Sequence, residues 1–185
     1  GFAYFNGEYH LFYQWFPLGP VHGIKHWYHV SSKDLVHWND CGVGIIPSEY
    51  FESHGAFSGS GLAENDKLYL FYTGNTRNDK WERHPYQCLA IMDSNGEITK
   101  NSEAVIKDLP NGYTDNFRDP KVFKDNNKYY LVDIKIAEDG SEFVKSIKDM
   151  FPMKEATKAL AIIDDTKKSE KLFEEINQDA TKYVE

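Results

Sequence analysis

Hydrophobic and polar residues alternate with a period of two from residue 1 to about residue 130, and short turn sequences interrupt the alternation. The clearest turn is Asn6-Gly7, a pair that hairpins with a type I′ turn prefer because both positions take a positive φ. This turn separates residues 2–5 from residues 8–14, the two expected strands of a hairpin. Similar interruptions occur at Asn65-Asp66, Ser94-Asn95-Gly96 and Asp125-Asn126-Asn127. The pattern predicts short antiparallel strands joined by tight turns.

The spacing of apolar residues changes near the C-terminus. Apolar residues there recur at i, i+4 and i+7 or i+8, which is typical of one face of an amphipathic helix. The three sets are Phe143, Ile147 and Met150, then Ala156, Leu160 and Ile163, and then Leu172, Ile176 and Ala180. We therefore expect helix over 141–180 and divide the chain into a β-domain, 1–132, and a helical segment, 133–185.

Three of the expected hairpins share one pattern, in which Leu11, Leu70 and Leu131 are equivalent and lie about 60 residues apart. A repeat of this length, made of several short strands, is typical of β-propeller blades, although hairpins of a β-sandwich would look similar. The expected fold is mostly β. Residues 1–132 would supply about two blades and the start of a third, whereas closing a propeller takes at least four.

Composition and charge exclude several classes of protein. Hydrophobic residues make up 41% of the 185 residues and charged residues 27%, as in a chain with a packed core. No apolar run reaches the roughly 18 residues of a membrane span, and the net charge of −8 disfavours nucleic-acid binding. Cys41 and Cys88 are too few for a disulfide framework and are typical of a reducing cytoplasm. Oligomeric state leaves no signature in the sequence.

The histidines do not predict a metal site. His22, His26 and His29 are close in sequence, but on a strand positions three apart point to opposite faces. The sequence therefore predicts neither a bound metal nor another cofactor.

A series of motifs covering residues 1 to about 132 resembles glycoside hydrolase family 32, the β-fructofuranosidases. The motifs are Phe12-Tyr13-Gln14-Trp15-Phe16-Pro17, Pro20-Val21-His22-Gly23, Trp27-Tyr28-His29-Val30, Ser32-Lys33-Asp34-Leu35, Gly55-Ala56-Phe57-Ser58-Gly59-Ser60, Phe71-Tyr72-Thr73-Gly74-Asn75 and Phe117-Arg118-Asp119-Pro120. The resemblance implies a five-bladed propeller and a retaining enzyme that hydrolyses a small carbohydrate, sucrose 6-phosphate or sucrose. Within the family, the sequences Pro20-Val21-His22-Gly23 and Trp27-Tyr28-His29-Val30 are most similar to the forms of these motifs in the bacterial sucrose-6-phosphate hydrolases.

Two motifs of that family are missing. Gly1 resembles the last residue of Asn-Asp-Pro-Asn-Gly, whose Asp is the family's nucleophile, and no Glu-Cys pair, the family's acid/base motif, occurs. A retaining glycosidase needs both carboxylates, so we expect this fragment to be inactive alone. A non-catalytic carbohydrate-binding or structural β-module with a helical, partner-binding tail remains the alternative.

The resemblance assigns roles to individual residues. Asp119 would stabilise the transition state, with Arg118 beside it, although Asp119-Pro120 could also simply begin a turn. Gln14, Phe57 and Ser58 would line the fructosyl subsite, and His22 stands where many family members have a tryptophan.

A basic segment follows the Thr73-Gly74-Asn75 motif. Arg77, Lys80 and Arg83 could bind the phosphate of a phosphorylated sugar, or could form a solvated, charged loop. Both readings stay open at this point.

Overall fold

The computed structural model describes residues 1–109, 111–126, 128–136 and 142–149. These residues form three antiparallel sheets and one short 3-10 helix, η1 (Tyr50–Glu52). The first sheet contains β1 (Phe2–Phe5), β2 (Glu8–Trp15), β3 (His26–Ser32) and β4 (Asn39–Ile45), in that order. The second contains β5 (Ala56–Glu64), β6 (Lys67–Arg77), β7 (Arg83–Met92) and β8 (Ile98–Lys100), and the third β9 (Arg118–Asp125), β10 (Lys128–Ile136) and β11 (Glu142–Asp149). In the described part of the chain, no helix is long and apolar enough to cross a membrane.

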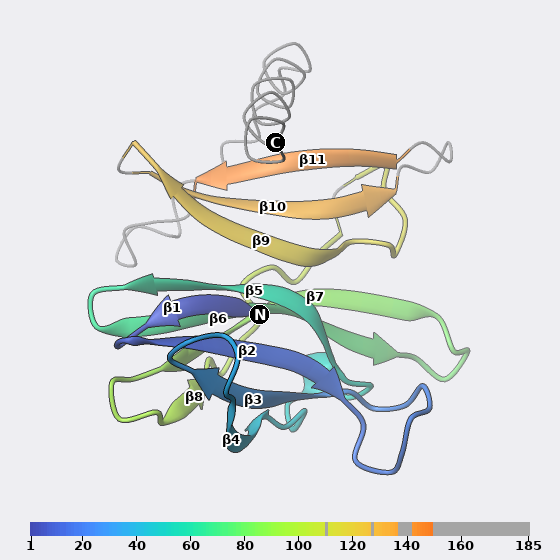
Figure 1. Ribbon diagram of the computed structural model, residues 1–185. Coiled ribbons are helices and arrows are strands. Elements are labelled where there is room, and N and C mark those ends of the chain that lie inside the picture. The colour runs from blue at the N-terminus through green and yellow to red at the C-terminus, as the bar shows by residue number, and fades with distance from the viewer. Residues whose placement is uncertain (110, 127, 137–141, 150–185) are drawn as a thin grey trace.

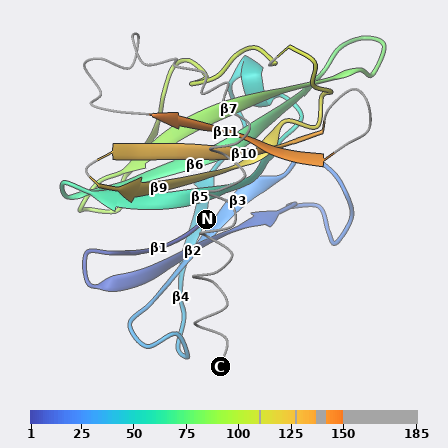
Figure 2. The ribbon, with the colours of Figure 1, turned by 90° about the horizontal axis from the view of Figure 1, so that it is seen from above.

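The three sheets are successive and equivalent, as the repeat predicts. Leu11, Leu70 and Leu131 each lie in the second strand of their sheet, on β2, β6 and β10. The third sheet lies above the second in Figure 1, and the first sheet extends to one side in the view from above (Figure 2). The fold is mostly β, and the prediction of successive sheets is confirmed.

The second sheet is buried on both faces because it lies between the other two. Leu68, Leu70 and Tyr72 on β6 pack into a core shared with the first sheet. Phe71, which points to the opposite face, packs with Val122 and the third sheet. A strand buried on both faces has a nearly continuous apolar sequence, which explains the run from Leu68 to Tyr72.

The hairpin turns follow the sequence. Asn6 and Gly7 have φ values of 50° and 83°, and Asn65 and Asp66 have 48° and 57°. Two consecutive positive φ values are the geometry of a type I′ turn, whose twist matches that of the flanking strands. The hairpins predicted at Asn6-Gly7 and Asn65-Asp66 are confirmed.

The prediction of a helix over 141–180 is wrong where the structure describes it. Residues 142–149 form β11, which pairs with β10 through Leu131 opposite Lys148 and Val132 opposite Ile147. Within 142–149 the expected pattern rests on Phe143 and Ile147, and residues four apart share a face on a strand as well as on a helix. Residues 150–185 lie outside the described residues. Strand β10 continues across residues 132 and 133. The division of the chain into two domains at that point stays a prediction.

A buried carboxylate anchors the segment that leads into β5. The Glu52 side chain is 0% exposed and pairs with the Lys100 ammonium. Tyr72 Oη donates to it at 2.7 Å, and the backbone amides of Ser48 and Glu49 donate to its other oxygen. With every oxygen satisfied, the ion pair fixes η1 against β6 and β8, just before the first residues of β5.

Candidate active site

A hydrogen bond joins the end of β2 to the start of β5. Gln14 Nε2 donates to Ser58 Oγ over 2.6 Å, and both side chains are exposed. Ser58 reaches this position because β5 carries a bulge. Ala56 pairs with Gly74 and Gly59 with Tyr72, so one extra residue is accommodated opposite β6. Bulges often re-aim side chains beside active sites, and this one places Ser58 next to Gln14.

Strands β5 and β9, from neighbouring sheets, lie side by side and run in the same direction. Ser60 Oγ donates to the carbonyl of Pro120 at 2.8 Å and accepts from the Val122 amide at 2.9 Å. Farther along both strands, Lys124 Nζ lies 2.7 Å from Glu64 Oε1. Residue numbers rise along both strands from the first contact to the second, so β5 and β9 run parallel to each other.

This alignment places Asp119 level with Ser58. Each residue lies before the first of the two contacts on its own strand, so both occupy the same end of the β5–β9 pair. The Asp119 amide donates to Thr73 Oγ1 at 2.9 Å, and Thr73 lies on β6 opposite the bulge that contains Ser58. Gln14, Ser58 and Asp119 are therefore linked through a continuous set of neighbours.

The Asp119 carboxylate is partly buried, with its side chain 33% exposed. Burial raises the pKa of Asp119 above its ordinary value, and the positive charge of Arg118 offsets part of that increase. Arg118 Nε lies 3.5 Å from Asp119 Oδ2. Burial is thus the larger of the two effects on the Asp119 pKa.

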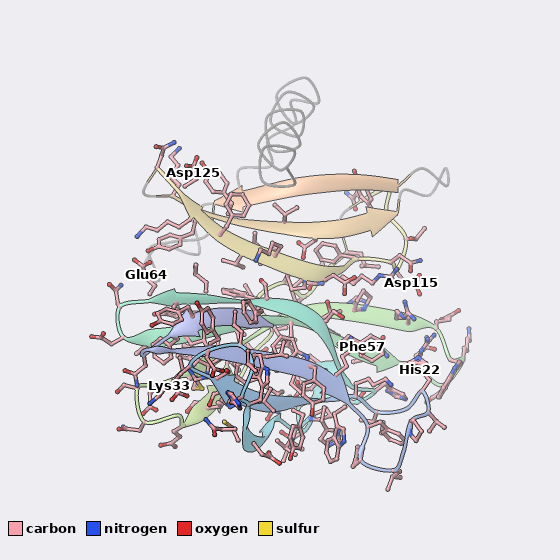
Figure 3. The ribbon with its side chains drawn as sticks, viewed as in Figure 1. His22, Lys33, Phe57, Glu64, Asp115 and Asp125 are labelled. Atoms are coloured by element: carbon pink, nitrogen blue, oxygen red, sulfur yellow. The ribbon has the colours of Figure 1, made fainter. Side chains whose placement is uncertain are left out.

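A pocket of about 620 Å³ opens between the end of β2 and the loop that follows it. It is lined by Gln14, Trp15, Phe16, Pro17, Gly19, Pro20, Val21, His22 and Lys25. His22 lies beside Phe57, with ring centroids 6.0 Å apart, and both appear at the same edge of the molecule in Figure 3, while Glu64 and Asp125 mark the opposite end. Polar and aromatic groups around an open cavity are typical of a site for a small polar ligand.

The three basic residues lie at the hairpin between β6 and β7. Arg77 and Arg83 lie opposite each other in the register of β6 and β7, and Lys80 is exposed at the tip of the hairpin. Arg77 Nη1 donates to the Trp81 carbonyl at 2.8 Å, and its guanidinium carbon lies 5.7 Å from the Trp81 ring centroid. In the described part of the chain, neither arginine has a carboxylate within ion-pair distance.

A short path of contacts connects this hairpin to the pocket. The Trp81 ring meets the edge of His54 with centroids 5.4 Å apart, and the next residue, Gly55, forms a β-bridge with Lys25 of the pocket. Sequence reasoning missed Lys25, because a single lysine in a loop carries no signal of the cavity that surrounds it.

Comparison with known proteins identifies the family. Residues 1–151 match the N-terminal domain of the glycosyl hydrolases family 32. A sucrose-6-phosphate hydrolase of Vibrio alginolyticus is 51% identical over 132 residues, which cover 71% of this chain and 27% of that protein. One of Streptococcus mutans serotype c is 45% identical over 148 residues, 80% of this chain and 31% of the relative.

Solved structures agree. The sucrose-6-phosphate hydrolase of Lactobacillus gasseri superposes with a TM-score of 0.74 at 46% identity, over 80% of this chain and 30% of that one. A family 32 β-fructofuranosidase of Bombyx mori, solved in complex with sucrose, gives 0.65 at 34% identity, over 75% of this chain and 29% of that one. This chain thus spans less than a third of these relatives. Its sheets are of the propeller type of that domain, and the chain belongs to glycosyl hydrolases family 32.

Proposed function

We propose that this chain forms the fructosyl-binding part of a retaining β-fructofuranosidase that hydrolyses sucrose 6-phosphate or sucrose. The observation that carries the proposal is the position of Asp119 at the same end of the β5–β9 pair as the exposed Gln14–Ser58 pair, of which Gln14 lines the open pocket. Residues 1–132 would supply two blades and the start of a third in a five-bladed propeller. Membership of family 32 supports both statements.

Each proposed residue would have a distinct task at the fructosyl ring. The Gln14 amide and the Ser58 hydroxyl, which already contact each other, would hydrogen-bond ring hydroxyls. The Phe57 ring would pack on the sugar face, and His22 beside it could donate a hydrogen bond where other members stack a tryptophan.

Asp119 would act mainly in the transition state. Its ionised carboxylate would accept hydrogen bonds from two sugar hydroxyls, and these bonds strengthen as positive charge develops on the ring. A partly buried carboxylate is suited to this task, because Coulomb interactions are stronger where water is partly excluded. Arg118 would limit the cost of keeping that charge in place.

The covalent chemistry would need two further carboxylates. A nucleophile would attack the anomeric carbon and form a fructosyl ester while an acid protonates the departing oxygen, and water would then cleave the ester. The family motifs that carry these groups, Asn-Asp-Pro-Asn-Gly and Glu-Cys, do not occur within these 185 residues. We therefore assign binding and transition-state stabilisation to this chain, and not bond cleavage.

Arg77, Lys80 and Arg83 would contact the phosphate of a phosphorylated substrate. The two arginines lie opposite each other on the hairpin without carboxylate partners in the described region, and the hairpin is linked to the pocket through His54. A guanidinium pairs well with a phosphate because its donors match two phosphate oxygens at once. A cytoplasmic location would fit such a substrate and the two free cysteines.

A chimeric enzyme tests the proposal. Residues 1–132 replace the matching segment of the Lactobacillus gasseri enzyme, and fructose release from sucrose 6-phosphate is measured. We expect hydrolysis, and a loss of about 10²–10³ in kcat/KM in Asp119→Asn, the range seen when one transition-state-stabilising group is removed. Asp125→Asn, at the far end of the same strand, is the matched control and should retain full activity. A folded chimera without activity, or equal activity in both variants, would contradict the proposal.

A further inference from the structure

The backbone at Asp119 is in an unfavourable conformation that its own sequence does not explain. Its φ is +60°, and it precedes Pro120. Residues other than glycine seldom take this region, and a following proline restricts the backbone further. Such a conformation persists only where surrounding groups hold it, so the structure should contain groups that do.

Two buried polar side chains on the second sheet meet this requirement. Thr73 is 2% exposed and Gln87 0% exposed, and they are paired across β6 and β7. The Asp119 amide donates to Thr73 Oγ1 at 2.9 Å, and the Thr73 hydroxyl donates to Gln87 Oε1 at 3.1 Å. Gln87 Nε2 then donates to the Phe117 carbonyl at 3.1 Å. The chain of bonds therefore holds the backbone at Phe117, just before β9, and at Asp119 within it.

The two ends of this chain of bonds have one role each, which fixes its direction: the Asp119 amide can only donate and the Phe117 carbonyl can only accept. Gln87 must therefore present its amide nitrogen to Phe117 and its oxygen to Thr73. The Thr73 hydroxyl has a single hydrogen, which it gives to Gln87, and therefore accepts from Asp119. Reversing any one bond would leave two buried groups unpaired, so the arrangement is unique.

We propose that Thr73 and Gln87 are positioning residues that hold Asp119 in its left-handed backbone conformation and so set the direction of its carboxylate. The effect on catalysis rests on the proposed function. The effect on the Asp119 backbone does not depend on the proposed function. A side chain leaves the backbone in a direction set by φ and ψ, so releasing the Asp119 amide would reorient the carboxylate without removing it.

Three variants of the 185-residue protein separate positioning from general stability. Thr73→Val has nearly the same shape but lacks the hydroxyl, Thr73→Ser keeps it, and Thr76→Val is the matched control. Thr76 lies three residues farther along β6, and its hydroxyl donates to the His84 carbonyl at 2.7 Å, away from β9. If Thr73→Val does not fold, Gln87→Met provides the second test, because it removes the anchor of Phe117 while leaving the Thr73 hydroxyl in place.

Hydrogen exchange at the Asp119 amide and the NMR titration of its carboxylate are the readouts. In Thr73→Val we expect exchange to be at least about tenfold faster and the Asp119 pKa to fall toward its ordinary value as the carboxylate gains solvent. Gln87→Met should shift both readouts in the same direction by less, and Thr73→Ser and Thr76→Val should resemble the parent. Unchanged exchange and pKa in Thr73→Val, or in Gln87→Met where that variant replaces it, would overturn the proposal.

The same substitutions in the chimeric enzyme test the catalytic consequence. Thr73→Val should lower kcat more than it raises KM, with recovery in Thr73→Ser. If the parent chimera is inactive, the proposed function fails while the exchange and titration data still decide whether Asp119 is held. If the parent is active and Thr73→Val has parental kcat, the positioning role is refuted and the proposed function stands.

Discussion

Acidification from pH 7 to pH 4.5 should weaken the first sheet through a buried pair of histidines. His10 Nδ1 lies 2.8 Å from His29 Nε2, and the two residues are 8% and 6% exposed. One ring donates to the other, which requires a neutral acceptor. Burial lowers the pKa of both groups, that of His29 to about 4, and the neighbouring His10 lowers it further. Glu8 opposes the shift at both sites.

The sign and size of the effect follow from this shift. Below pH 6.5 an unfolded histidine binds a proton, whereas folded His29 stays neutral until about pH 4. The unfolded state therefore binds more protons in that interval, and the free energy of unfolding falls as the pH falls from about 6.5 to about 4. Two pH units of this difference, each about 1.4 kcal/mol, correspond to a loss of roughly 2–3 kcal/mol at pH 4.5.

Urea unfolding at both pH values measures the loss. The parent protein should lose about 2 kcal/mol more than His29→Gln, which has no ring to protonate. His26→Gln, at the other end of the same strand, serves as the control and should follow the parent. Equal pH dependence in the parent and in His29→Gln would show that protonation of His29 does not limit the stability of the first sheet.

Three further predictions concern stability, activity and specificity. Lys100→Met strands the buried Glu52 carboxylate and should cost about 3 kcal/mol in urea unfolding, whereas Lys107→Met, from an exposed pair, should cost less than about 1 kcal/mol; equal losses would contradict the anchoring role. The 185-residue chain alone should release no reducing sugar from sucrose or sucrose 6-phosphate, and turnover abolished by Asp119→Asn would be the contrary result. In the chimera, Arg77→Gln should lower kcat/KM for sucrose 6-phosphate by about 10-fold or more while sparing sucrose; equal effects on both substrates would exclude phosphate contact.

The sequence predicts features that depend on neighbouring residues. Asn6-Gly7 requires a tight turn because of its own backbone preferences, and the hairpin forms there. The repeat at Leu11, Leu70 and Leu131 identifies equivalent strands because each hairpin has to bury the same pattern. The helix expected at 141–180 fails for 142–149, since spacing by four residues also suits a strand and the open edge of β10 provides hydrogen-bond partners.

Features that depend on strand register or on contacts between sheets could not be predicted in this way. The bulge that carries Ser58 depends on the register with β6, and the alignment of β5 with β9 depends on Ser60 meeting Pro120. Thr73 lies in one of the motifs that resemble family 32, but the role of Thr73 and Gln87 depends on partners that the third sheet supplies. The resemblance to family 32 named Asp119 as a site residue, but the conformation that directs it arises only from the packed sheets.

A crystal structure of the chimeric enzyme with bound fructose would show whether this chain forms the fructosyl subsite. We expect a hydroxyl of the sugar to lie about 2.7–3.0 Å from an Asp119 oxygen, with Gln14 and Ser58 within hydrogen-bonding distance of the same ring. Fructose bound in an ordered position elsewhere, with Asp119 facing solvent, would contradict the claim that this chain forms the fructosyl subsite.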